Sequence, residues 1–226
     1  MRRRYAGIAA IASALAAYIL LGRSWQLRWG ATSEECGEPL PGDDLIAGPD
    51  LTATRAITIR APASQVGPWI VQLGQGRGGF YSYDFLENLI GCDIHSADRI
   101  ATEWQDVEVG DEVRLAPQVS LAVAFVEVGR SLVLRGGVPM GNAAPPYDFT
   151  WAFVLKDGPE RTSRLLVRER YAYTRPWARL VVEPISAVSF VMSQKMLRGI
   201  RDRTEDIAAV PSAAAEPVPG ESSRYE

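Results

Sequence analysis

Hydrophobic and polar positions alternate through the middle of the chain and recur at helical spacing on either side of it. The alternation begins in Thr52–Arg60, where Ile57 and Ile59 fall on one face of a predicted strand. Five further strands are predicted, at Val113–Leu115, Leu121–Val128, Leu132–Arg135, Asp148–Leu155 and Ser163–Tyr173. Glycine-containing connections separate the last four of these, so we expect neighbouring strands to run antiparallel.

Helical patterns bracket these strands. Ala63–Leu73 is predicted as a helix disturbed by Gly67 and Pro68, and Trp177–Arg203 as a long closing helix. The apolar residues that fall at helical spacing in the long helix are Ile185, Val188, Met192 and Met196. Ala208–Glu226 is rich in Ala, Pro, Ser and Glu and is predicted to be a disordered tail. The order of these elements predicts an α+β fold with one antiparallel sheet and a long C-terminal helix.

A glycine-rich unit, Pro68–Gly91, lies between the first strand and the others. Its glycines spell the pattern G-x-G-x-x-G at Gly74, Gly76 and Gly79. With Asp98 downstream, this pattern could indicate a dinucleotide site, but such a site needs a long helix after the glycines. Aromatic residues and antiparallel strands follow here, so a structural turn is favoured. Asp84 is expected to cap a short helix, Phe85–Ile90.

The N-terminal residues differ in kind from the rest. Tyr5–Gly22 is an uncharged run of 18 residues that follows three arginines. As a helix it would reach about 27 Å, close to the thickness of a hydrocarbon core. Trp25 and Trp29 fall where an interfacial aromatic belt belongs. Residues 1–28 are therefore predicted to be a membrane anchor, with a cleaved signal peptide or a buried helix as alternatives. The arginines favour a cytoplasmic N-terminus and a domain on the outer side.

Residues 29–50 are rich in Gly, Pro, Asp and Glu, and are predicted to be an extended linker. Cys36 and Cys92 are the only cysteines, and their spacing leaves open whether they pair. His95 is the only histidine, so no metal site is indicated. The net charge of -3 gives no sign of nucleic-acid binding.

Several segments together resemble a known superfamily. They are WGAT, LPGDDL, TRAITIRAP, GRGGFYSYDFLENLIG, IHSADRI and FVMSQKMLRGI. From Trp29 to Arg203 the chain resembles the SRPBCC superfamily, which includes the START and polyketide-cyclase-like proteins. The resemblance implies a helix-grip domain over residues 51–206, with a curved sheet wrapped around the long helix and an apolar cavity between them. It implies a binder of lipid or other small hydrophobic molecules or, in some branches, an enzyme.

The strand faces also suggest a cavity. Alternation places aromatic residues of Asp148–Leu155 and Ser163–Tyr173 on one face of the sheet. Glu169 would lie among them, either as an anchor for a polar group of the ligand or as a salt-bridged structural residue. The expected ligand-binding residues are Trp69, Tyr83, Phe85, Phe125, Trp151, Phe153, Glu169, Tyr171, Val188 and Met192.

No catalytic residue and no cofactor are indicated, because the sequence marks no nucleophile with a base. Tyr83, Arg135 and Tyr171 stay open as groups that a cyclase-like enzyme could use. The favoured function is membrane-tethered binding of a small hydrophobic ligand. A cyclase-like enzyme and an interaction or structural module with a filled core are the alternatives.

Overall fold

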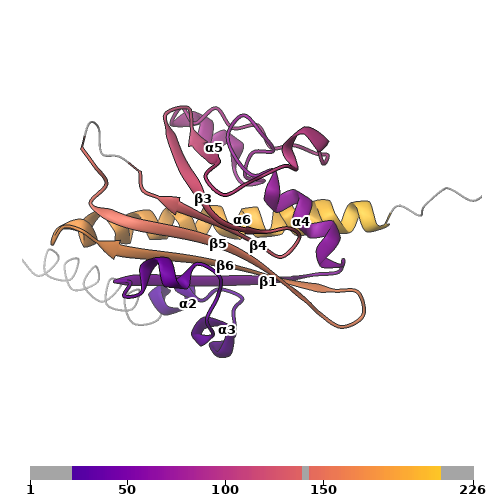
Figure 1. Cartoon of the computed structure of the whole chain (residues 1–226), viewed down its shortest axis with the longest axis horizontal. Helices are drawn as coiled ribbons and strands as arrows, with labels where there is room; N and C mark the ends of the chain where they lie inside the picture. Colours follow the sequence, from indigo (N-terminus) through magenta and orange to yellow (C-terminus); the bar gives the residue numbers. More distant parts are fainter. Residues whose placement is uncertain (1–21, 139–142, 210–226) are drawn as a thin grey trace, which may run out of the picture.

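The computed structural model describes residues 22–138 and 143–209. Six strands form one fully antiparallel sheet in the order β1-β6-β5-β4-β3-β2, and the long helix α6 crosses one face of it (Figure 1). The strands are β1 Leu51–Ile59, β2 Glu112–Ala116, β3 Val119–Glu127, β4 Ser131–Gly136, β5 Tyr147–Asp157 and β6 Ser163–Tyr173. The helices are α2 Arg23–Leu27, α3 Ser33–Gly37, α4 Ala63–Val71, α5 Asp84–Leu89 and α6 Ala178–Ala209, with 3₁₀ turns η2 Asp43–Ile46 and η3 Thr102–Trp104.

This arrangement confirms the predicted α+β class and the helix-grip architecture. The sheet face toward α6 holds the main hydrophobic core, in which Trp69 of α4, Phe153 of β5 and Leu197 of α6 are fully buried. Burial of such large side chains stabilises a fold by about 1.5–3 kcal/mol each. The sheet and α6 are therefore held together mainly by apolar contact.

Residues 29–50 are not an extended linker, because they fold as α3 and η2 against the opposite face of the sheet. Leu40 packs there in a second small core with Val154 and Leu166. Arg168 of β6 holds this segment on the sheet by hydrogen bonds. Its guanidinium donates to Asp43 Oδ2 at 2.6 Å and to the backbone carbonyls of Glu35 and Glu38. Both faces of β5 and β6 are thus covered.

The predicted membrane segment, Tyr5–Gly22, lies outside the described residues except for Gly22. The chain that follows it is fixed to α6, because Arg23 forms an ion pair with Glu183 at 2.8 Å and the Trp25 ring packs edge-on against Phe190. Among the described residues, one helix is long and apolar enough to cross a membrane, and it is α6 itself. Since α6 also covers the core, that property is weak evidence for a membrane span.

The glycine-rich unit forms a tight turn. Gly74 and Gly79 pair across it as an isolated antiparallel bridge, and Gly79 has a positive φ of 69°. A Cβ at Gly79 would lie 2.8 Å from Cα of Ser96, so the glycine is required by a close backbone approach as well as by its φ. The turn leads into the short helix α5 and antiparallel strands, as expected for a structural role.

Two local predictions need correction. Asp84 begins α5 but makes no capping bond; its carboxylate instead accepts from the backbone N–H and the hydroxyl of Ser96, at 2.7 and 2.6 Å. The long helix extends to Ala209, beyond the predicted Arg203, and the rest of the predicted tail lies outside the described residues. Cys36 and Cys92 are both free.

Candidate functional site

A cavity of about 200 Å³ lies between the sheet and the middle of α6. Its sheet side is lined by Leu115, Val138, Tyr147, Phe149, Trp151, Glu169 and Tyr171. Its other side is lined by Phe80, Ser82 and Glu87, which lie in and before α5, and by Ile185, Ser189, Met192, Ser193 and Met196 of α6. The odd-numbered residues of β5 and β6 point to α6 because side chains alternate along a strand. The alternation seen in the sequence therefore builds the cavity wall.

The structure brings together four of the ten residues predicted to bind a ligand. Trp151, Glu169, Tyr171 and Met192 line the cavity. The other six do not line it: Trp69 and Phe153 are fully buried in the core, and Tyr83, Phe85, Phe125 and Val188 are exposed on the surface. Periodicity identified β5, β6 and α6, which supply cavity residues, but it also placed ligand residues on α4 and β3, which supply none, and it could not separate the cavity wall from packed core or exposed surface.

Phe125 shows why the pattern failed on β3. Leu121 and Val123 are buried, and strict alternation would put Phe125 beside them. The pairing of β3 with β4 shifts between Val123 and Phe125, which marks a β-bulge. Beyond the bulge Val126 packs against the core, and Phe125 is left 39% exposed.

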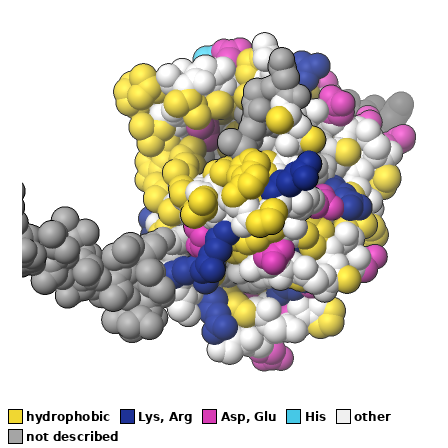
Figure 2. Space-filling model, turned by 90° about the vertical axis from the view of Figure 1, so that its left-hand side faces the viewer, with side chains coloured by type: hydrophobic (Ala, Val, Ile, Leu, Met, Phe, Trp, Pro, Cys, Tyr) yellow, Lys and Arg dark blue, Asp and Glu magenta, His cyan; other side chains and the backbone are white. Residues whose placement is uncertain are grey.

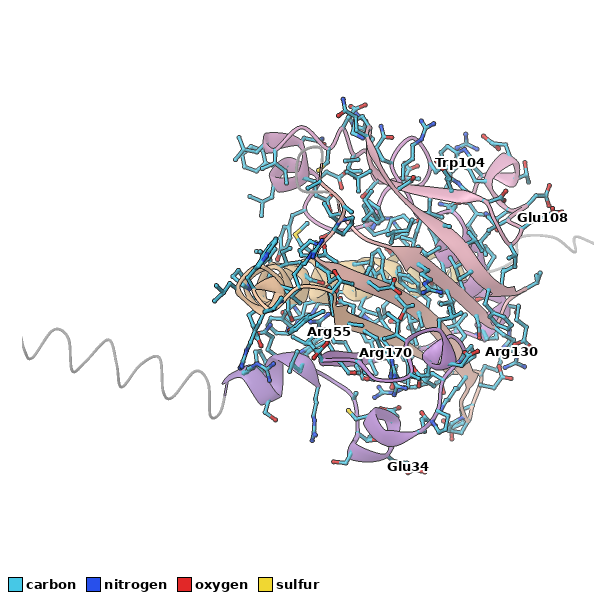
Figure 3. All side chains as sticks on the ribbon, turned by 60° about the vertical axis from the view of Figure 1, so that its left-hand side comes forward. Glu34, Arg55, Trp104, Glu108, Arg130 and Arg170 are labelled. Atoms are coloured by element: carbon cyan, nitrogen blue, oxygen red, sulfur yellow. The ribbon has the colours of Figure 1, made fainter. Side chains whose placement is uncertain are left out.

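Glu169 is held at the inner wall of the cavity by a buried network. Its Oε1 accepts from Arg55 Nη1 at 2.6 Å and from the hydroxyls of Ser189 and Ser193 at 2.6 and 3.3 Å. Its Oε2 accepts from the Tyr171 hydroxyl at 3.2 Å. Arg55 also donates to the Gln26 carbonyl, and Figure 3 shows its side chain between α2 and α6.

These contacts favour the structural role for Glu169 over that of a ligand anchor. Arg55 is fully buried and Glu169 is 1% exposed, so each charge depends on the other for compensation. Four donors already occupy the carboxylate, which leaves little capacity for a ligand. Burial and the neighbouring Glu169 carboxylate raise the pKa of Tyr171 well above its ordinary value, so Tyr171 stays neutral.

Glu87 is the residue that sequence reasoning missed. Glu87 lines the cavity, and its Oε2 is buried with no hydrogen-bond partner in the described part of the chain. Burial, and secondarily the Asp84 carboxylate, raise the pKa of Glu87 from 4.5 to about 7. The Nε1 of Trp151, in the same cavity, is likewise buried without a partner. One unpaired acceptor and one unpaired donor thus lie in the walls of an apolar cavity.

The residues left open for cyclase-like chemistry do not converge. Tyr83 is exposed, Arg135 forms an ion pair with Asp148 at 2.6 Å outside the cavity, and only Tyr171 lines it. Among the described residues, no three His, Cys, Asp or Glu side chains gather as a metal site would require. No Lys, Arg or His lies among the described residues that line the cavity.

The antiparallel sheet, the long C-terminal helix and the cavity between them define a helix-grip domain. No protein-family model and no curated protein matches the chain. Solved structures that match include the hypothetical protein jhp0584 from Helicobacter pylori, at 11% identity and TM-score 0.46, covering 77% of this chain and 99% of that one. The ZhuI aromatase/cyclase from Streptomyces sp. R1128 matches at 13% identity and TM-score 0.42, covering 73% of this chain and 99% of that one.

A third match is protein MLL2253 from Mesorhizobium loti, at 13% identity and TM-score 0.43, covering 69% of this chain and 98% of that one. With identities and scores this low, the ligand of this chain has to be inferred from its own cavity.

Proposed function

We propose that the chain is a membrane-tethered protein that binds a small hydrophobic molecule in the cavity between the sheet and α6. The observation that carries this proposal is the cavity itself, because a module with a filled core would have none of this size in its aromatic face. A dry apolar cavity of roughly 150 Å³ accommodates benzene, and drug-sized ligands occupy about 300–1,000 Å³. A volume of about 200 Å³ therefore suits a ligand of one or two rings, or a short chain, better than a two-chain lipid.

The polar groups of the wall indicate the chemistry of the ligand. Glu87 offers an unpaired carboxyl oxygen and Trp151 an unpaired N–H, and no basic side chain faces the cavity among the residues that line it. A hydroxyl group satisfies both, since it can donate to Glu87 and accept from Trp151. An anionic ligand would meet the carboxylate of Glu87 with no cation to offset it. The proposed ligand is thus a neutral, hydroxylated apolar molecule.

Binding of two matched probes tests this proposal. 1-Naphthol and 1-naphthoate share a two-ring skeleton and differ in charge, so titration calorimetry at pH 8 should detect binding of the naphthol and much weaker binding of the naphthoate. Glu87→Gln should reduce the difference in affinity between 1-naphthol and 1-naphthoate, because it removes the negative charge that disfavours the naphthoate. Equal binding of both probes by the original chain would contradict the proposed ligand chemistry.

Two substitutions on one strand separate a cavity from a filled core. Trp151→Ala should weaken binding of 1-naphthol while the domain stays folded, because Trp151 lines the cavity. Phe153→Ala, on the same face but fully buried in the core, should instead lower the free energy of unfolding by about 3–5 kcal/mol. If Trp151→Ala mainly costs stability as well, the face is filled core and the proposal fails.

Membrane tethering is supported by the length and composition of Tyr5–Gly22 and by its flanking arginines and tryptophans. Cell fractionation should place the full chain in membranes and a version that begins at Thr32 in the soluble fraction. Equal solubility of the two would refute the tether. Protease added to intact cells should cut the C-terminal residues if the domain lies on the outer side, and protection of those residues would reverse the proposed orientation.

A further inference from the structure

The helix α5 exposes its apolar face and turns its polar face toward the protein. Its polar residues face the body of the protein: Asp84 accepts from Ser96, Glu87 lines the cavity, and Asn88 exchanges two hydrogen bonds with the backbone of Ile94. Its apolar residues face outward, where Phe85, Leu86, Leu89 and the following Ile90 are 46–80% exposed. An isolated surface helix in water would normally adopt the reverse arrangement.

A second exposed apolar stripe runs along α6. Leu180, Pro184, Val188 and Val191 recur every three or four residues and therefore share one face of the helix. Leu180 is 78% and Val188 64% exposed. Figure 2 looks at this end of the molecule, and hydrophobic side chains gather toward the upper left of that view.

The two stripes lie on the outer sides of α5 and α6, the two helices that supply lining residues to the cavity. Ser82, just before α5, donates to the Met192 carbonyl of α6 at 3.1 Å, so the start of α5 touches the middle of α6. Glu87 and Ser189, on the inner sides of the two helices, line the same cavity. We call the outward residues Phe85, Leu86, Leu89, Ile90, Leu180, Val188 and Val191 the apolar rim. An apolar rim beside a hydrophobic cavity marks a binding surface rather than scattered exposed side chains.

The chain itself indicates what covers the rim. The uncharged run Tyr5–Gly22 joins the domain at α2, and α2 is fixed to α6 by the ion pair of Arg23 with Glu183 and the contact of Trp25 with Phe190. A segment that enters a bilayer at Gly22 would hold this end of α6 at the bilayer surface. Trp25 and Trp177, both about half exposed, supply the aromatic residues that settle at such a surface.

Basic residues surround the same end of the molecule. Arg23 and Arg179 both pair with Glu183, and Arg175 is exposed just before α6. Two acids, Glu183 and Asp50, lie beside Arg23 and Arg179 here, so with the exposed Arg175 the local charge is only slightly positive, which still favours anionic over neutral lipid headgroups. The rim thus combines an apolar face with a border that carries arginines, as a surface that lies on a bilayer does.

We propose that the apolar rim docks on the lipid bilayer, with the side chains of α5 and the α6 stripe inserted among the lipids and with the cavity beside them. This goes beyond tethering, because it places the described domain itself, and not only Tyr5–Gly22, in contact with lipid. It builds on the proposed tether but does not depend on any ligand.

Depth-dependent fluorescence quenching tests the docking in the full chain. Cys36 and Cys92 are first replaced by serine, and a single cysteine is introduced by Leu89→Cys to carry an environment-sensitive fluorophore. The matched control is Val128→Cys, in the turn between β3 and β4, where an apolar residue is 89% exposed but lies outside the rim. Both labelled proteins are reconstituted, without ligand, in vesicles of phosphatidylcholine and phosphatidylglycerol that contain acyl-chain nitroxide lipids. Circular dichroism checks that each variant is folded.

The expected result is a blue shift and loss of fluorescence for the label at residue 89, and neither for the label at residue 128. Two outcomes overturn the proposal. In one, both labels remain unquenched although the protein floats with the vesicles, which means that the tether alone contacts the membrane. In the other, the blue shift at residue 89 appears without quenching and grows with protein concentration, which means that a second copy of the chain covers the rim. Since no ligand is present, failure of the ligand proposal leaves the result unaffected.

Discussion

The charge of Glu169 is expected to contribute strongly to the stability of the fold, because Glu169 is the ion-pair partner of the fully buried Arg55. Glu169→Gln preserves the shape of the side chain and most of its hydrogen bonds but removes the charge. In the described part of the chain, Arg55 would then keep only neutral acceptors: the amide oxygen of the substituted side chain, the Gln26 carbonyl and the Ser193 hydroxyl. The guanidinium cannot lose its proton at accessible pH.

The magnitude follows from burial. Arg55 and Glu169 are 0% and 1% exposed, so solvent screens the uncompensated charge very little. Removing one partner of a buried ion pair costs about 3–5 kcal/mol, a large part of the 5–15 kcal/mol that stabilises a typical domain. Replacing both partners, by Arg55→Met with Glu169→Leu, should cost clearly less than Glu169→Leu alone because no charge is left unpaired.

The assay is urea denaturation of the full chain in detergent micelles, followed by tryptophan fluorescence and circular dichroism. The four proteins of a double-mutant cycle, built from Arg55→Met and Glu169→Leu, give the coupling energy of the pair. The structural role of the network would be refuted if Glu169→Gln lowered the free energy of unfolding by less than about 1 kcal/mol. It would also be refuted if the loss in the double variant equalled the sum of the losses in the two single variants.

Three further outcomes are expected. The pKa of Glu87 is about 7 in the folded state and 4.5 in the unfolded state, so the folded state binds more protons between these pH values. The free energy of unfolding should therefore fall as pH rises from about 4.5 to 7. Glu87→Gln should remove this fall, as measured by thermal melts. Gly79→Ala should destabilise the fold by more than Gly76→Ala in urea denaturation, because both positions have positive φ but only Gly79 lies against backbone. Arg168→Met should expose residues 29–50 to proteolysis, since four hydrogen bonds of its guanidinium hold that segment on the sheet, and unchanged cleavage would contradict this role.

The sequence by itself determined the order and type of the main elements. Period-two alternation in Asp148–Leu155 and Ser163–Tyr173 identified β5 and β6 and the faces of Trp151 and Tyr171, because a strand exchanges faces at every residue. The resemblance to the SRPBCC superfamily pointed to the same architecture. These features are local, so a short window of sequence is enough to specify them.

Only the tertiary structure decided which residues form the cavity wall. Trp151 and Phe153 share one face and one strand, yet the first lines the cavity and the second is core, because α4 and α6 cover different parts of that face. A bulge that depends on pairing between β3 and β4 turned Phe125 outward. Likewise Arg164, Arg168 and Arg170 of β6 hold residues 29–50 by hydrogen bonds that span more than a hundred residues of chain.

The helix α5 departs furthest from its local pattern. Taken alone, Phe85 and Leu89 predict a face turned to the core, and Glu87 a face turned to water. Hydrogen bonds from the backbone of Ser96 and Ile94, in the loop that follows the helix, hold Asp84 and Asn88 toward that loop and leave the apolar side chains on the outer side. The residues of a helix set how much apolar surface it carries, and the hydrophobic effect favours burying that surface. In α5 the polar partners available in three dimensions determine which way it faces.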